Sequence, residues 1–465
     1  MENKNLSTCS KALDKASSKI KEFINSIIDK ASFVETDAFL TGKGFESAFE
    51  ALGEGVVTGY ATVGGKPVHL FAQNSEVLKG SLSVAHAEKI CKAMQRAIKS
   101  GTPFISIVDS CGARIGEGAG IMEGYAQIIA MADEVAANVP HLCIVKGNAV
   151  GMMATYVANA DFTFVAKGAV VSVNSPMYHM SNTKSFPINY GDKFGFAAYE
   201  KGTDMLNFGF DNASELKSKL AKLLTIIFPA DEEEAEDDAN RVDPQLENAV
   251  DATYRINSVC DKDSVVEFCP NYAKEVKCSF AKLNGISVGV LATEKEYLTA
   301  DGLEKAIDFI NKLDFYDLPL ITLVDSLGTN PDLASEYKGF AKLTSKLMIT
   351  IANSSIEKIG VAVGNAEGYV YSALMSKGIG FDYTLATSNA VISPISCDTA
   401  VETVLKDQLV KDNNSDEMRA KLAEQYAQLQ ANPILAAKDG YIDNVIEATN
   451  LRPYLASALL MLLGI

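Results

Sequence analysis

Short apolar runs and amphipathic stretches alternate along this chain, and the length of each stretch suits one kind of element. Mostly apolar residues at 104–108 and continuous apolar residues at 142–145 are typical of buried strands. A stripe of apolar residues at helical spacing predicts a helix over 84–99. Residues 55–63 and 68–72 predict two strands joined by a Gly64-Gly65 hairpin. Strands that alternate with helices at this spacing predict an α/β fold.

The second half of the chain repeats this order. Pro319 matches Pro103 at an offset of 319 − 103 = 216 residues, and Gly364 matches Gly147 at 364 − 147 = 217. Offsets that drift by only a few residues are what loop insertions produce. We therefore predict two copies of one domain, at residues 31–230 and 246–465.

Three further segments complete the predicted organisation. Residues 1–30 predict a helical segment with an apolar face that includes Ile20 and Ile24. Residues 231–245 begin with a run of acidic side chains, which repel one another, so we expect a solvated linker without chemistry. The apolar stretch 454–465 is too short to span a bilayer and predicts a helix that closes the core.

The most informative stretches are GNAVGM at 147–152 and GNAEGY at 364–369. Each follows a predicted strand and precedes residues that suit a helix. A strand, a glycine-bearing turn and a helix start leave backbone N–H groups unpaired at the turn. Such groups can hold a negative oxygen that forms during a reaction. The alternative is that Gly147 and Gly364 only make tight turns, and the repetition favours the first interpretation.

Composition narrows the class of protein. The chain has 465 residues, of which 48% are hydrophobic and 22% charged, as in soluble globular proteins. Its net charge of −17 argues against a nucleic-acid partner. Eight cysteines without a C-x-x-C pair indicate reduced thiols, and we expect no metal site. Because the N-terminus shows no signal-peptide pattern, we expect a cytoplasmic protein.

Four ordered motifs carry a resemblance to a known family. They are GVVTGY at 55–60, GSLSVAHAEKI at 80–90, DSCGARIGEG at 109–118 and ADFTF at 160–164. Their order resembles the carboxyltransferase subunits of biotin-dependent acyl-CoA carboxylases and of the related decarboxylases. The resemblance implies two tandem crotonase-like β-β-α superhelical domains. It implies an acyl-CoA site in domain 31–230 that faces a biotin site in domain 246–465 of another subunit, in a dimer or a ring-shaped hexamer.

The resemblance also implies catalytic residues, because carboxyl transfer places transient negative charge on the thioester enolate and on the ureido group of biotin. The family's two oxyanion motifs fall on residues 150–153 and 367–370. We expect the N–H groups of Gly151 and Met152 to hold the enolate oxygen. We expect those of Tyr369 and Val370, together with Gly368, to hold the biotin oxygen.

This chain departs from the family at several of these positions. Met152 and Tyr369 stand where the family has a second glycine, which narrows the space beside the backbone donors. Gly364 and Asn365 stand where Arg-Lys is common, and FPINYG at 186–191 replaces an expected Gly-Gly-x-x-His stretch. In the second half, DSLGT at 325–329 replaces Asp-Val-Pro-Gly-Phe. Substrate choice and the biotin site are therefore the least determined features.

Several side chains are further candidates. The residues expected to line the acyl-CoA pocket are Cys111, Gly112, Ala113, Arg114 and Val150. Arg114 suits a CoA phosphate or carboxylate; the alternative is a structural pair with Glu117 or Glu123. Glu367 is a candidate acid or base, with a solvated loop glutamate as the alternative. His86 is expected to pack or cap its helix, with an acid-base role as the alternative. Cys111 and Cys397 are expected to be small packing residues.

Together these features predict a carboxyltransferase component that moves a carboxyl group between biotin and the α-carbon of an acyl-CoA thioester. The chain shows no biotin-attachment or ATP-binding motif, so we expect a separate biotin carrier protein and a carboxylase or decarboxylase subunit as partners. A peripheral position on a membrane-bound decarboxylase complex stays open. Two alternatives also stay open: a crotonase-type acyl-CoA enzyme that needs no biotin, and a non-catalytic scaffold subunit.

Overall fold

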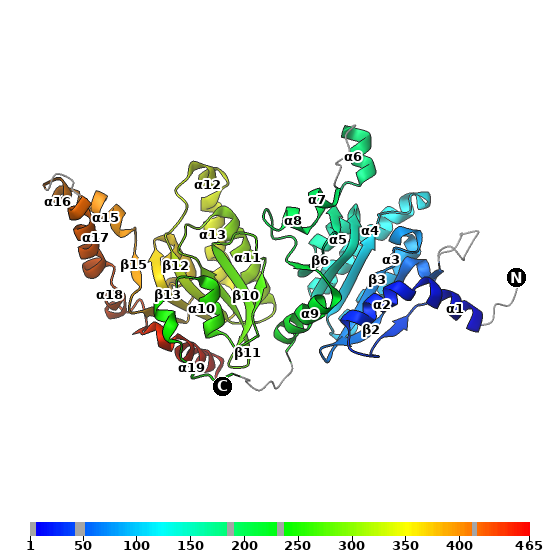
Figure 1. Cartoon of the computed structure of the whole chain (residues 1–465), viewed down its shortest axis with the longest axis horizontal. Helices are drawn as coiled ribbons and strands as arrows, with labels where there is room; N and C mark the ends of the chain where they lie inside the picture. Colours follow the sequence, from blue (N-terminus) through cyan, green and yellow to red (C-terminus); the bar gives the residue numbers. More distant parts are fainter. Residues whose placement is uncertain (1–5, 42–51, 184–189, 230–236, 412–415) are drawn as a thin grey trace. The chain divides into compact units, whose positions relative to one another are not determined.

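The computed structural model describes residues 6–41, 52–183, 190–229, 237–411 and 416–465. The chain forms two compact units, Met1–Phe228 and Pro229–Ile465, drawn in Figure 1. The N-terminal helical segment belongs to the first unit. Among the helices of the described ranges, none combines the length and the apolar character that crossing a membrane requires.

The first unit is built on an eight-stranded sheet in the order β1-β2-β3-β4-β5-β6-β8, with β7 paired to β5. Its first strand pairs, β1–β2 and β2–β3, are antiparallel, and the others are parallel. The strands are β1 (Val34–Thr36), β2 (Val56–Val63), β3 (Lys66–Gln73), β4 (Phe104–Ser110), β5 (His141–Val150), β6 (Phe162–Ala166), β7 (Val170–Ser172) and β8 (Phe208–Phe210). The predicted hairpin and buried strands are confirmed.

The helices of the first unit are α1 (Leu6–Ala16), α2 (Ser18–Ile27), α3 (Val84–Ser100), α4 (Ala119–Ala136), α5 (Met152–Ala158), α6 (Pro176–Thr183), α7 (Tyr190–Phe194), α8 (Phe196–Tyr199) and α9 (Ala213–Ile227). A core of buried side chains joins α3, α4 and α5 to the sheet and includes Ile90, Met94, Phe104 and Met153. The predicted helix over 84–99 is confirmed as α3, which Ser83 caps by accepting from the His86 N–H.

The second unit repeats this architecture strand for strand, in the order β16-β14-β13-β12-β11-β10-β9 with β15 paired to β13. Its strands are β9 (Val266–Phe268), β10 (Val276–Leu283), β11 (Ile286–Thr293), β12 (Leu320–Ser326), β13 (Lys358–Glu367), β14 (Tyr383–Thr387), β15 (Val391–Ser393) and β16 (Asn444–Ile446). Its helices are α10 (Ala252–Val259), α11 (Ala300–Phe315), α12 (Leu333–Tyr337), α13 (Phe340–Asn353), α14 (Tyr369–Leu374), α15 (Cys397–Thr403), α16 (Lys406–Lys411), α17 (Asp416–Gln430), α18 (Pro433–Lys438) and α19 (Leu451–Leu463). The predicted duplication is confirmed, and α19 buries Leu455 and Leu459 in the core as expected.

The repeat extends further than the sequence pattern indicated. In the first unit, the carboxylate of Asp29 accepts from the N–H groups of Gly64 and Gly65 at 3.1 and 2.8 Å. In the second unit, Asp261 accepts in the same way from the hairpin residues Asn284 and Gly285, at 2.9 and 2.8 Å. Each aspartate follows a helix, α2 or α10, that packs on its sheet. The N-terminal helices are thus a repeated part of the unit rather than an appendage.

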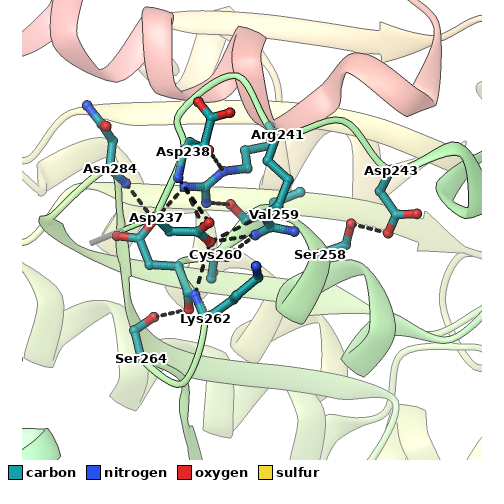
Figure 2. Close-up of polar contacts among 12 residues, drawn as sticks. Asp237, Asp238, Arg241, Asp243, Ser258, Val259, Cys260, Lys262, Ser264 and Asn284 are labelled. Carbon is teal, nitrogen blue, oxygen red and sulfur yellow. Dashed lines mark hydrogen bonds and ion pairs between the residues drawn. The ribbon is translucent and has the colours of Figure 1, made fainter. Parts of the chain in front are cut away.

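The prediction of a solvated linker over 231–245 holds for five exposed residues of its described part, 237–245, but other residues of this part form ion pairs (Figure 2). Asp237 is partly buried, with a side chain 9% exposed, and pairs with Arg241 at 3.0 Å. Arg452 of α19, which is buried, donates to the Asp238 carbonyl and to Asp261 at 2.9 and 2.7 Å. The guanidinium groups of Arg241 and Arg452 therefore neutralise carboxylates, among them that of Asp237, which the sequence pattern predicted to be solvated. Residues 231–236 lie outside the described ranges.

A buried lysine in each unit was not anticipated. Lys89 Nζ donates to the carbonyls of Gly53 and Val56 at 3.1 and 2.7 Å, and burial lowers its pKa to about 8. Lys305, 305 − 89 = 216 residues later, donates to three carbonyls at 2.8–2.9 Å. The sequence signal that could have revealed these buried lysines is their position within the apolar stripe of each repeated helix. Each one satisfies carbonyl oxygens of the chain that enters a hairpin.

Candidate active site

The first candidate site lies where β5 passes into α5. β5 ends at Val150, and Gly151 then adopts φ 70° and ψ −135°, a conformation that favours glycine. The N–H of Gly151 donates to the Ser172 carbonyl at 2.9 Å. The prediction that this N–H holds an enolate oxygen is therefore wrong, because strand pairing with β7 already uses it.

Two other backbone donors remain at this turn. The N–H groups of Met152 and Met153 begin α5 and have no acceptor within the described ranges, as expected of a helix start without a side-chain cap. Met152 is 43% exposed, so this edge of the turn reaches the surface. We call Gly151, Met152 and Met153 the first cradle.

The second unit builds the same turn between β13 and α14. Gly368 has φ 54° and ψ −124°, and its N–H donates to the Ser393 carbonyl at 2.8 Å. The prediction that Gly368 contributes a free donor is therefore also wrong. The N–H groups of Tyr369 and Val370 have no acceptor in the part of the chain that the structure describes. We call Gly368, Tyr369 and Val370 the second cradle.

Gly147 and Gly364 have a different role from the predicted one, because neither makes the turn. Both lie inside their strands, β5 and β13, where the register with the neighbouring strand shifts. The carboxylate of Asp109 packs against Gly147 and accepts from the Asn148 N–H at 3.1 Å. In the second unit, Asp325 packs against Gly364 in the same way. The glycines are thus required by close approach of a carboxylate, which fixes the strand just before each cradle.

Alanine at Gly147 or Gly364 should destabilise its unit by about 1–3 kcal/mol, because the new Cβ would clash with the aspartate carboxylate. Urea unfolding of each variant measures the loss. Gly202→Ala is the matched control, since a Cβ there meets open space. Equal stability of the Gly147 variant and the control would contradict the proposed packing role.

The loop after β4 lies beside the first cradle. Gly112 has φ 112°, and a Cβ built on it would lie 3.7 Å from the carbonyl oxygen of Val150. Ala113 pairs with Leu82 in an isolated parallel bridge that holds the loop. Cys111 and Ala113 are exposed, so the expectation that Cys111 is a packing residue is wrong. The structure thus brings four of the five predicted pocket residues, 111–113 and 150, to one edge of the sheet.

Arg114 does not fit its predicted role. Its guanidinium is buried and pairs with Glu54 at 2.6 Å, with the two side chains 6% and 2% exposed. It also donates to the Glu54 carbonyl at 3.0 Å. The expectation of a CoA ligand is therefore wrong, and the alternative partners Glu117 and Glu123 were wrong as well. Glu54 was missed because it lies 60 residues away in the chain and nothing in the pattern marks it.

The structure bears on the other candidate side chains, His86, Glu367 and Cys397, in different ways. His86 is fully buried, its Nδ1 lies 2.8 Å from the Glu54 carbonyl oxygen, and burial lowers its pKa to about 3. Its predicted packing role is confirmed. Glu367 is not a solvated loop residue, because it ends β13 and is 5% exposed. Cys397 lies at the start of α15 and is half-buried. Of the FPINYG stretch, residues 186–189 lie outside the described ranges.

The two cradles, their shared strand–turn–helix geometry and the glycine loop after β4 suggest a chemistry of transient oxyanions. A family model described as a carboxyl transferase domain matches residues 12–463. The chain belongs to the carboxyl transferase family. This carboxyltransferase works with biotin and an acyl-CoA thioester, as its motifs predict.

Individual relatives agree with this assignment. The mitochondrial propionyl-CoA carboxylase beta chain of Rattus norvegicus is 30% identical over 455 residues, which cover 93% of this carboxyltransferase and 82% of that protein. The methylmalonyl-CoA carboxyltransferase 12S subunit of Propionibacterium freudenreichii subsp. shermanii is 29% identical over 463 residues, covering 95% and 88%. A crystal structure of transcarboxylase 12S, a hexamer with hydrolysed methylmalonyl-coenzyme A bound, matches with a TM-score of 0.87 at 27% identity. The match covers 97% of this chain and 91% of that one, and the predicted tandem crotonase-like fold is confirmed.

Proposed function

We propose that the first unit binds the acyl-CoA thioester and that the second unit binds biotin carried by a separate protein. The acyl group is propionyl or methylmalonyl in this proposal, because the relatives are named for these substrates. The observation that carries the proposal is the duplicated cradle. Each unit offers two neighbouring backbone N–H groups without an acceptor in the described ranges, at Met152 and Met153 and at Tyr369 and Val370.

The first cradle suits the thioester oxygen. Donors aimed at a developing negative charge are each worth about 2.7–4 kcal/mol of barrier in comparable enzymes. Met152 and Met153 would supply these donors, since Gly151 shapes the turn but has its own N–H engaged. Val150, Cys111, Gly112 and Ala113 would line the acyl-CoA pocket, where exposed Cys111 and Ala113 can reach a ligand.

The second cradle suits biotin, which when bound supplies the nitrogen that carries the carboxyl group. Its free donors, Tyr369 and Val370, match a single acceptor oxygen such as that of a ureido group. Tyr369 is 65% exposed, so its ring is available to a partner or ligand at the surface. The two free N–H groups therefore fit the ureido oxygen of biotin, and the tyrosine side chain narrows the space beside them.

The proposed assembly follows from the same logic. The partners are a biotin carrier protein and a carboxylase or decarboxylase subunit. The functional form is a homo-oligomer, a dimer or a hexamer, in which a first cradle meets a second cradle of another copy. The hexameric assembly named for transcarboxylase 12S supports this part of the proposal.

A carboxyl-exchange assay tests the proposed function. Malonyl-, methylmalonyl- and glutaconyl-CoA are each incubated with the purified protein, with and without free biotin. We expect exchange with methylmalonyl-CoA that requires biotin. Turnover without biotin would instead indicate a crotonase-type acyl-CoA enzyme, and failure to bind any of the CoA esters would indicate a scaffold subunit.

A further inference from the structure

The two units carry different residues at one equivalent position. Val150 ends β5 and Glu367 ends β13, and each immediately precedes the glycine of its cradle. Both residues are buried, with exposed fractions of 6% for Val150 and 5% for Glu367. The residue that directly precedes the second cradle therefore carries a carboxyl group, whereas the residue that precedes the first cradle is apolar.

Polar groups from three parts of the second unit face this carboxyl. Asn365, on the same side of β13, donates its side-chain amide to Glu367 Oε1 at 3.1 Å. Asp398 and Cys397 of α15 and Lys295, which follows β11, interact with it electrostatically. Burial and the like charge of Asp398 raise the pKa of Glu367, whereas the Asn365 hydrogen bond and Lys295 oppose the rise. Glu367 thus keeps its proton to a higher pH than an ordinary glutamate.

The protonation state decides what this carboxyl can do beside the second cradle. A carboxylic acid donates a hydrogen bond through its O–H, whereas a carboxylate only accepts and repels a negative oxygen. Gly368 cannot serve as a donor because its N–H is bonded to Ser393. A third donor is therefore available at this cradle only when Glu367 is protonated. An apolar site that keeps a carboxylic acid neutral for this purpose is an established device in enzymes.

We propose that protonated Glu367 donates a hydrogen bond to the ureido oxygen of biotin, alongside the N–H groups of Tyr369 and Val370. The inference rests on the proposed function, in which the second unit binds biotin. No bond to Glu367 forms or breaks, and its proton stays on the carboxyl group. Val150 cannot act in this way, so the thioester oxygen in the first cradle depends on backbone donors alone.

Two variants of Glu367 separate hydrogen-bond donation from titration. Glu367→Gln keeps a donor that does not titrate, whereas Glu367→Ala removes the donor. Calorimetry of free biotin binding, in buffers of different ionisation enthalpy, measures proton uptake at pH values above the ordinary glutamate pKa of 4.5. The wild type should take up protons on binding once the pH exceeds the raised pKa of Glu367, whereas Glu367→Gln should take up none. The rate of biotin-dependent exchange should decrease with rising pH in the wild type. This pH dependence should be absent in Glu367→Gln. Glu367→Ala should slow exchange by about 10²-fold.

Two neighbours provide matched controls with opposite signs. Asp398→Asn removes the like charge that raises the pKa of Glu367, so the fall in exchange should move to lower pH. Asn365→Ala removes a hydrogen bond that lowers this pKa, so the fall should move to higher pH. A purely structural role of Glu367 would not produce two opposite shifts.

The outcomes distinguish this inference from the proposed function. If exchange requires biotin but Glu367→Gln keeps the wild-type proton uptake and pH profile, the role of Glu367 is overturned and the proposed function stands. If the wild type neither binds free biotin nor requires it for exchange, both are overturned. Loss of proton uptake in Glu367→Gln, with opposite shifts in the two neighbours, supports the inference.

Discussion

Proline at position 152 or 369 should lower the rate of carboxyl transfer by about 10²–10³-fold while the protein stays folded. Met152 and Tyr369 are the first residues of α5 and α14, where proline fits the helix and removes only the backbone N–H. In the proposed mechanism that N–H is one of two backbone donors in each cradle. The loss should therefore appear in kcat rather than in stability. Steady-state exchange kinetics and thermal unfolding measure the two quantities separately.

Met152→Ala and Tyr369→Ala are the matched controls. Each truncates the same exposed side chain but keeps the backbone donor, so each should lose far less activity than its proline counterpart. Equal losses in the alanine and proline variants would show that the side chains, and not the amides, carry the effect. The two positions also report separately on the two units, because one lies in each cradle.

Replacing Arg114 with methionine should destabilise the first unit by about 3–5 kcal/mol, since it leaves the Glu54 carboxylate buried without its ion-pair partner. The effect is enlarged by the backbone at Glu54, which adopts φ 59° between two glycines that are also left-handed. Arg114 holds this turn through both the carboxylate and the carbonyl. Denaturant unfolding followed by circular dichroism measures the change.

Glu123→Gln is the control for this prediction, because Glu123 is an exposed residue of α4 and its neutralisation should change stability by less than about 0.5 kcal/mol. The double variant Glu54→Gln, Arg114→Met should recover part of the loss, since no unpaired charge is then buried. A stable Arg114→Met protein with weaker binding of the CoA thioester would contradict the structural role and restore the role expected from the motif.

Much of the fold could be predicted because it depends on local patterns that occur twice. The apolar runs at 104–108 and 142–145, the stripe around Ile90 and the Gly64-Gly65 hairpin each have a period or a turn signal of their own. Their recurrence in the second half made the duplication visible. The linker prediction missed the ion pairs of Asp237 with Arg241 and Arg452, because the second of these arginines lies at the far end of the chain.

The two glycine-bearing turns lie where the sequence predicts them, but the backbone amides that stay free differ from the expected ones. The residues of both cradles follow from the glycine-bearing turns, yet the free donors are one position later than expected in the first unit and exclude Gly368 in the second. Strand pairing decides this, since Ser172 and Ser393 accept the glycine N–H groups. Nothing local to residues 147–152 indicates which carbonyl will lie opposite Gly151.

By itself, the sequence determined that this protein is a duplicated α/β carboxyltransferase with one glycine-bearing turn per copy. Only the tertiary structure decided which amides stay free, that Arg114 pairs with Glu54, and that Glu367, the residue before the second cradle, is buried. The physical reason is that periodicity and turn chemistry act between near neighbours. Hydrogen-bond saturation, ion pairing and the pKa of a buried group instead depend on residues that folding brings together from distant parts of the chain.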